Sequence, residues 1–159
     1  MTGSFNAKSE PNHDFDAQNP HERLFDRQAG EYLRRVNEPL ALLLCNRGLI
    51  ATQLKERLEA LRYRMVTINE PAELVARAES ERAMVVFADL EGRAEAVTAA
   101  VDNLRGTQPT AHVPVIGFQK EMDEAAQLSL SARGFAVAVG ESAILTHLPL
   151  LLERALELR

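Results

Sequence analysis

Cysteine is almost absent from this chain, and its scarcity excludes two kinds of stabilising centre. The 159 residues include one cysteine, Cys45. No intramolecular disulfide can form, and a zinc cage built from thiolates is excluded because it needs several cysteines. The four histidines, His13, His21, His112 and His147, are scattered along the chain. We therefore expect no metal site built from them.

Long apolar runs and an excess of basic residues are lacking as well. No uninterrupted apolar stretch approaches the ~20 residues that a membrane-spanning helix needs. The first residues show no apolar segment flanked by basic residues, so no signal peptide is expected. The formal net charge is -5, whereas a general nucleic-acid binder presents a basic face to the phosphates. These absences predict a cytoplasmic protein in a reducing compartment that binds neither nucleic acid nor membrane.

What the sequence does contain divides it into two parts. The first residues are rich in Ser, Asn, Asp, Gln and Pro and show no periodicity, which predicts a flexible tail. Apolar residues at spacings of three and four then predict a short amphipathic helix over residues 20–36, which Pro39 ends. We expect residues 1–37 to be this tail with its helix. Residues 38–159 are expected to form a domain, since 46% of the chain is hydrophobic.

From Leu40 onward, short apolar runs alternate with amphipathic stretches. The runs are LALLLC, RMVTIN, AMVVFADL, VPVIGF and FAVAVG, and they are typical of strands buried on both faces. The first amphipathic stretch carries leucines at helical spacing, namely Leu49, Leu54, Leu58 and Leu61, which predicts that they share the buried face.

Proline and glycine mark the ends of the other predicted helices. Pro71 fits the first turn of the second helix, and Gly106 and Gly134 end the third and the fourth. Pro149 either kinks the last helix or marks its true start. Five strand-helix repeats predict an α/β fold with a five-stranded parallel sheet and helices on both faces, in the flavodoxin-like order.

The polar residues that follow these strands are expected to meet at one edge of the sheet. Ligands of such sheets bind outside the carboxyl ends of the strands. Asp89 lies at the end of the third run and Gln119 directly after the fourth. Cys45 and Asn46 mark the end of the first run.

The stretch from Pro39 to Leu158 resembles the receiver domain of response regulators. VVFADL resembles the third receiver strand with its phosphoacceptor aspartate, and VPVIGF resembles the fourth strand. SARGFAVAV is similar to the passage from the fourth helix into the fifth strand, and LKERLEALRY is similar to the first helix. The resemblance implies the flavodoxin-like fold and a role in phosphorelay signal transduction.

The resemblance also implies which residues occupy the receiver site, and most of them depart from the family pattern. Asp89 takes the phosphoacceptor position. Cys45 and Asn46 replace the acidic pair that binds Mg²⁺, a metal that prefers hard oxygen ligands. Gln119 replaces the Ser or Thr, and Glu141 reverses the charge of the Lys. The chain is therefore similar to a degenerate pseudo-receiver, for which we expect no catalytic residue, metal, cofactor or enzyme activity.

Two positions are open to more than one interpretation. Asp89 is either a vestigial phosphoacceptor or a strand-end carboxylate that binds backbone amides of the next loop. Cys45 is either a redox thiol or a small buried residue that ends an apolar run. The Gly48 turn lacks a nucleotide-binding motif, although Arg47 beside it could assist an anion.

The favoured function is that of a stand-alone, atypical receiver-like protein that binds a protein partner, such as a histidine kinase, without the usual aspartyl phosphorylation. The apolar last helix either packs into the core or offers a face for a homodimer. The alternatives are an unorthodox receiver phosphorylated at Asp89, a small flavodoxin-like ligand or nucleotide binder, and a structural oligomerisation module.

Overall fold

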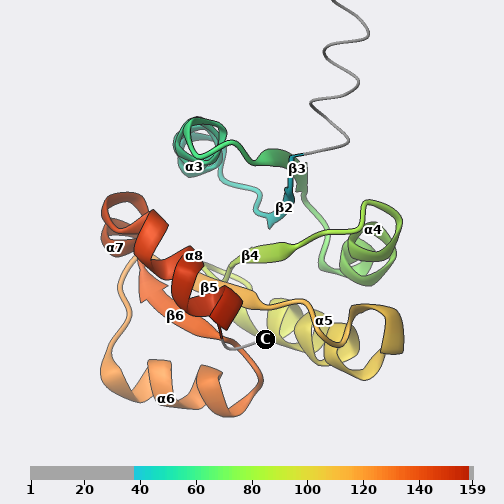
Figure 1. Ribbon diagram of the computed structural model, residues 1–159. Coiled ribbons are helices and arrows are strands. Elements are labelled where there is room, and N and C mark those ends of the chain that lie inside the picture. Colours follow the sequence, from blue (N-terminus) through green and yellow to red (C-terminus); the bar gives the residue numbers. More distant parts are fainter. Residues whose placement is uncertain (1–37, 158–159) are drawn as a thin grey trace, which may run out of the picture. The chain divides into compact units, whose positions relative to one another are not determined.

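A computed structural model describes residues 38–157, and within this range the chain forms a five-stranded parallel sheet. The expected tail and the helix over residues 20–36 lie outside the described residues. The strands are β2 (Leu40–Leu44), β3 (Arg64–Ile68), β4 (Val85–Asp89), β5 (Val115–Gln119) and β6 (Val137–Gly140). Their order in the sheet is β3-β2-β4-β5-β6, which confirms the expected flavodoxin-like order (Figure 1).

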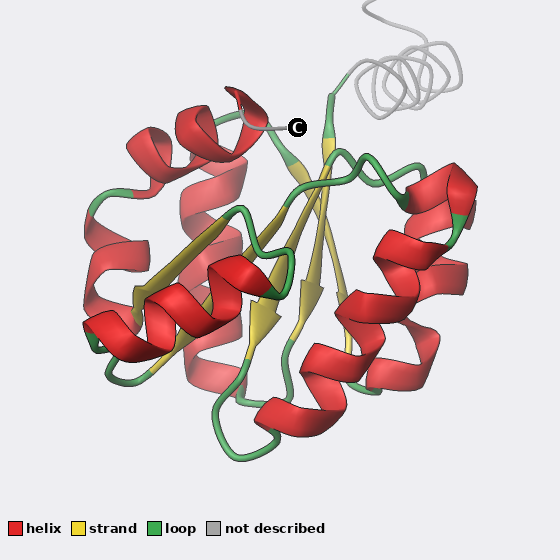
Figure 2. Ribbon diagram, turned by 90° about the horizontal axis from the view of Figure 1, so that it is seen from below, coloured by secondary structure: helices red, strands yellow, loops and turns green. Residues whose placement is uncertain are grey.

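The helices are α3 (Gly48–Ala60), α4 (Leu74–Ser80), α5 (Ala94–Gly106), α6 (Glu124–Ala132), α7 (Glu141–Thr146) and α8 (Leu148–Glu157). Two short 3-10 turns are η1 (Pro71–Glu73) and η2 (Gln108–Thr110). Figure 2 shows helices on both faces of the sheet, as expected for right-handed crossovers between parallel strands.

Successive side chains of each strand point to opposite faces of the sheet, and this alternation creates two cores, one on each face. In β2, Leu42 and Leu44 pack with α4 and α5, while Ala41 and Leu43 pack with α3, α7 and α8. All five residues of β2 and all five of β4 are buried. A continuous apolar run is required here because successive side chains point to opposite faces and both faces are covered.

The first helix buries a narrower face than its leucines suggested. Ile50, Leu54 and Leu58 are buried, whereas Leu49 is 76% exposed and Leu61 is 36% exposed. The buried set is spaced by four residues, so it lies along one line of the helix surface. The prediction that Leu49 and Leu61 share the buried face is therefore wrong.

The last predicted helix is two helices. α7 ends at Thr146 and α8 begins at Leu148, so Pro149 lies in the first turn of α8 and marks its start. Proline has no N–H and cannot donate to a carbonyl one turn earlier, so a single continuous helix through this position would lose a hydrogen bond. Pro71 plays the same part in η1, ahead of α4.

Candidate functional site

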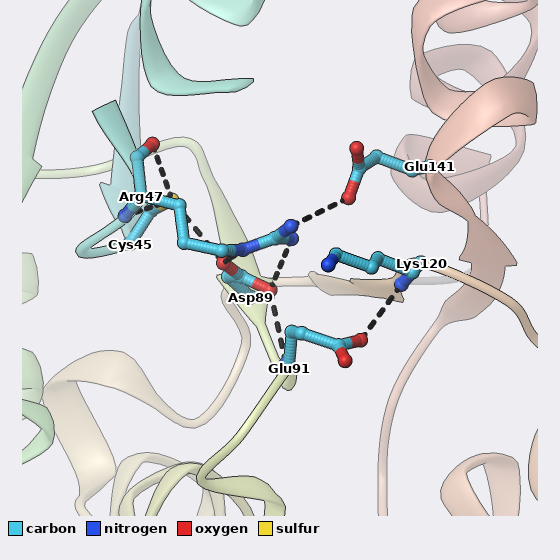
Figure 3. Close-up of polar contacts among 6 residues, drawn as sticks. All are labelled: Cys45, Arg47, Asp89, Glu91, Lys120 and Glu141. Atoms are coloured by element: carbon cyan, nitrogen blue, oxygen red, sulfur yellow. Dashed lines mark hydrogen bonds and ion pairs between the residues drawn. The ribbon is translucent and has the colours of Figure 1, made fainter. Parts of the chain in front are cut away.

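The candidate site lies where the parallel strands end, and it is centred on Asp89. Asp89 is the last residue of β4 and is 1% exposed. Cys45 follows β2 directly, and Glu141 is the first residue of α7. The strand order places β4 in the middle of the sheet between β2 and β5. Figure 3 shows the polar side chains that gather around this position.

Both oxygens of the Asp89 carboxylate are occupied by donors. Arg47 donates from Nε to Oδ2 at 2.7 Å and from Nη2 to Oδ1 at 2.9 Å, in the bidentate geometry typical of arginine and carboxylate. The backbone N–H of Glu91 donates to Oδ1 at 3.0 Å. The Cys45 thiol lies 3.3 Å from Oδ2. A buried carboxylate needs such partners because its desolvation is costly.

Arg47 joins three separate segments of the fold. It is the residue that precedes α3, in an extended conformation. Beyond its two bonds to Asp89, its Nη1 forms an ion pair with Oε2 of Glu141 at 2.8 Å. The hydrogen bond with Asp89 is the main reason that the pKa of Arg47 is raised above its usual range, with a smaller contribution from Glu141. The guanidinium therefore stays charged and ties the β2–α3 loop to β4 and to α7.

Cys45 is a buried, protonated thiol. Its side chain is 1% exposed, and burial raises its pKa to about 11, with a further contribution from the charge of Asp89. Its proton can be donated to Asp89 or to the carbonyl of Arg47, which lies 3.5 Å from the sulfur. At neutral pH such a thiol is a poor nucleophile because the reactive species is the thiolate. The interpretation as a small buried residue accounts for these observations.

Glu91 and Lys120 complete the cluster. The Glu91 carboxylate accepts a hydrogen bond from the backbone N–H of Lys120 at 2.9 Å, which links the loops after β4 and β5. The Lys120 side chain extends toward Arg47 and Asp89 (Figure 3). Its backbone stands one residue beyond the end of β5.

The remaining positions of the receiver pattern do not reach Asp89. Asn46 is exposed. Gln119 turns back onto its own loop, where its Nε2 donates to the carbonyl of Glu121 at 2.9 Å. Glu141 does face the site, but Arg47 stands between the two carboxylates (Figure 3).

These residues do not fit a Mg²⁺ ion. Such an ion requires several free oxygen ligands, whereas both Asp89 oxygens are bound to Arg47. Cys45 offers sulfur in place of oxygen, and Asn46 is exposed. Across residues 38–157, the structure brings together no group of three or more His, Cys, Asp and Glu side chains that could hold a metal.

Sequence reasoning identified Asp89 and did not identify its main partner. From the sequence alone, Arg47 is expected only to assist an anion, and no contact is predicted for Glu91. The available signal was positional: both residues lie just beyond buried strands, at the edge where the parallel strands end. The sequence carries no motif that distinguishes an arginine aimed at Asp89 from one aimed into solvent.

Comparison with known proteins supports the fold. No protein-family model matches the sequence, and no curated protein matches it. Response regulators and receiver domains are among the solved structures that resemble it. A chemotaxis response regulator, CheY4 of Vibrio cholerae, aligns over 74% of this chain and 98% of its own, with a TM-score of 0.66 and 17% identity.

Two further response regulators show the same likeness. One from Desulfuromonas acetoxidans has a TM-score of 0.66 at 15% identity, and one from Thermotoga maritima has a TM-score of 0.65 at 13% identity. Each covers 76% of this chain and 98% of its own. The described domain has the receiver fold. Within that fold, Asp89 stands at the end of the third strand along the domain, the position that the sequence resemblance assigned to the phosphoacceptor.

No helix among residues 38–157 is long and apolar enough to cross a membrane.

Proposed function

We propose that this chain is an atypical receiver-like signalling module that acts by binding a protein partner and is not phosphorylated at Asp89 in the usual way. The observation that carries the proposal is the bidentate Arg47–Asp89 pair, with N–O distances of 2.7 and 2.9 Å. It supports a module in which the acceptor carboxylate is permanently neutralised by the protein itself. The chain is accordingly proposed not to be an enzyme.

Phosphoryl transfer to Asp89 would require one of its oxygens to be free and the incoming charge to be compensated. Neither oxygen is free, because Arg47 and the Glu91 amide bind Oδ1 while Arg47 and the Cys45 thiol bind Oδ2. A phosphoryl group carries up to two negative charges. Because the Asp89 carboxylate loses its own charge on bonding to it, the site would gain up to one net negative charge. The group would also arrive where the carboxylates of Asp89, Glu91 and Glu141 already outnumber the cations of Arg47 and Lys120. Stabilisation of charge on the transferring oxygens, which such reactions depend on, is poor here.

Arg47 also contributes to the internal order of this edge of the domain. In this arrangement one guanidinium attracts the carboxylate at the end of β4 and the carboxylate at the start of α7. A second arginine, Arg57 of α3, donates to the carbonyl of Leu145 at 2.7 Å. α7 is thus held against α3 at two points, which favours a single persistent conformation of this face.

Across residues 38–157, few large apolar side chains are exposed: Leu49, Leu61, Leu128 and Leu150. Most apolar residues of α8 are buried, namely Leu148, Leu151, Leu152 and Ala155, so core packing accounts for most of its apolar character. Leu150 is 53% exposed on the same helix. We propose that the face around Leu150 contacts a protein partner or a second copy of the chain.

The decisive test of the chemistry is intact mass spectrometry after incubation with acetyl phosphate and Mg²⁺. The wild-type chain and the Asp89→Asn variant are expected to remain unmodified under conditions that phosphorylate a working receiver in the same tube. A mass gain of one phosphoryl group in the wild type that disappears in Asp89→Asn would overturn the proposal and establish the alternative of an unorthodox, phosphorylated receiver.

The interaction role is tested separately by capture from the native cell with wild-type protein and with Leu150→Glu. Recovery of a signalling protein by the wild type, and its loss with the variant, is the expected result. Light scattering on the same two proteins reports whether this face pairs two copies. Equal recovery and equal mass with both proteins would contradict the assignment of this face.

A further inference from the structure

Helix α6 is attached to the domain differently from the other long helices. None of its nine residues is buried, whereas α3, α5 and α8 each bury at least three. Leu128 at its centre is 68% exposed. Met122 and Leu130 are partly buried and pack against the core on the face of the sheet that α4 and α5 also cover. Helices in proteins are stabilised mainly by the packing of an apolar face, and α6 has little of this stabilisation.

The sheet beneath α6 is covered by a residue from outside the helix. Phe135, which follows α6, is 3% exposed and belongs to the core of that face. A Cβ added to Gly117 of β5 would lie 2.7 Å from the Phe135 ring, so the ring rests directly on the strand backbone. The core below α6 is therefore closed by Phe135, and α6 lies outside it.

Arg105, in the last turn of α5, supplies the strongest attachment of this segment. Its Nη1 donates to the carbonyls of Ala111 at 2.9 Å and Val113 at 3.0 Å. Its Nε donates to the carbonyl of Gly134 at 3.0 Å, and its Nη2 donates to the same carbonyl. Gly134 lies at φ +99, in the turn that follows α6. One guanidinium thus binds the segment before β5 and the turn after α6.

The arginine is suited to this position because it stays charged when partly buried. Burial lowers its pKa, and the four hydrogen bonds to carbonyl groups compensate part of that desolvation. Hydrogen bonds from a charged donor are stronger than those between neutral groups.

The other attachments of α6 are weaker. Arg133 pairs with Asp102 of α5 at 2.8 Å, with side chains that are 50% and 49% exposed; exposed pairs of this kind contribute little. Gln127 donates to the carbonyl of Ala138 in the edge strand β6 at 2.9 Å. These contacts and the Arg105 bonds are polar, and solvent can replace them.

We propose that α6 and the turn after it, residues 123–134, form a segment that opens locally while the sheet stays folded. The hydrogen bonds of Arg105 hold this segment in the closed position. Local opening needs less free energy than global unfolding where few apolar contacts are lost. Opening uncovers Phe135 and the apolar surface around it. The device therefore controls access to an apolar surface, independently of the chemistry at Asp89.

Amide hydrogen exchange followed by mass spectrometry on the full chain tests this proposal. In the wild type, amides of residues 124–132 are expected to exchange at least ~10-fold faster than those of α5 and β4. Their exchange rate should not change at low denaturant concentration, because local opening exposes little surface. Arg105→Met is expected to raise exchange over residues 124–134 by a further ~10-fold and to leave β2 and β4 unchanged. Arg133→Met is the matched control, because it removes an arginine of the same segment that is half exposed, and it should change exchange less than ~3-fold.

Two results would overturn the proposal. One is wild-type protection of α6 equal to that of α5, and the other is an acceleration by Arg105→Met that spreads equally over all peptides. If Arg105→Met fails to fold, Arg105→Lys takes its place. Lysine keeps the charge but cannot bind three carbonyls at once as the planar guanidinium does. The variant should accelerate exchange over residues 124–134, with a smaller effect on the segment before β5, and leave β2 and β4 unchanged.

Discussion

Replacement of Arg47 by methionine should destabilise the domain strongly, because it leaves the Asp89 carboxylate buried without its cation. Asp89 is 1% exposed and loses two hydrogen bonds, of 2.7 and 2.9 Å, in this variant. Removal of one partner of a buried ion pair costs about 3–5 kcal/mol. Methionine retains the apolar stem of arginine, so packing changes little. Glu141, whose side chain is 28% exposed, loses its ion pair in the same variant, and this loss adds to the cost.

A double-mutant cycle separates this effect from general damage to the site. Asp89→Asn should cost about 1–2 kcal/mol, because the neutral amide still accepts the Glu91 N–H and Arg47 keeps Glu141. The variant that carries both changes should fall short of the sum of the single costs by about 2–3 kcal/mol. Arg57→Met, in the helix that follows Arg47, is the matched control, with an expected cost of about 1 kcal/mol or less for one exposed hydrogen bond.

The assay is urea unfolding followed by far-UV circular dichroism, since the chain has no tryptophan to report by fluorescence. The free energy of unfolding and its slope with urea are compared across the variants. A cost below about 1 kcal/mol for Arg47→Met, or single costs that simply add in the double variant, would refute the view that this pair holds the site together.

Four further predictions rest on burial, on the raised pKa of Cys45 and on geometry. Cys45 should resist alkylation in the folded protein at pH 8, and labelling of the native chain at the rate of an unfolded control would contradict its burial. Because its folded pKa of about 11 lies above the ordinary value of 9.0, the free energy of unfolding should fall as pH rises from 9 to 11, and this part of the slope should be absent in Cys45→Ala. Gly117→Ala should cost about 1–3 kcal/mol because its Cβ would meet an aromatic ring at 2.7 Å, whereas Gly106→Ala, with nothing within 4 Å, should be neutral or stabilising in thermal melts. Leu54→Ala should cost about 2–5 kcal/mol, while Leu49→Ala, at a position 76% exposed, should change the urea midpoint very little.

Much of the fold could be predicted from local patterns because each pattern has a direct physical cause. Continuous apolar runs such as LALLLC indicate strands covered on both faces, and β2 is buried at every residue. Pro149 marks the start of α8 because a residue without an N–H is tolerated in the first turn of a helix. Leu49 shows the limit of this reasoning. Helical spacing is compatible with a buried face that includes either Leu49 or Ile50, and only packing in the folded domain buries Ile50.

The sequence by itself determined the strand-helix order, the receiver-like arrangement and the placement of Asp89 at the end of a central strand. Those features depend on periodicity and on the ends of elements, which are local properties of the chain. Tertiary structure alone decided what Asp89 does there. Arg47 lies 42 residues before Asp89, and Glu141 lies far beyond it in the sequence. Their charges meet only because the parallel strands bring their ends to the same edge, where one guanidinium pairs with both carboxylates.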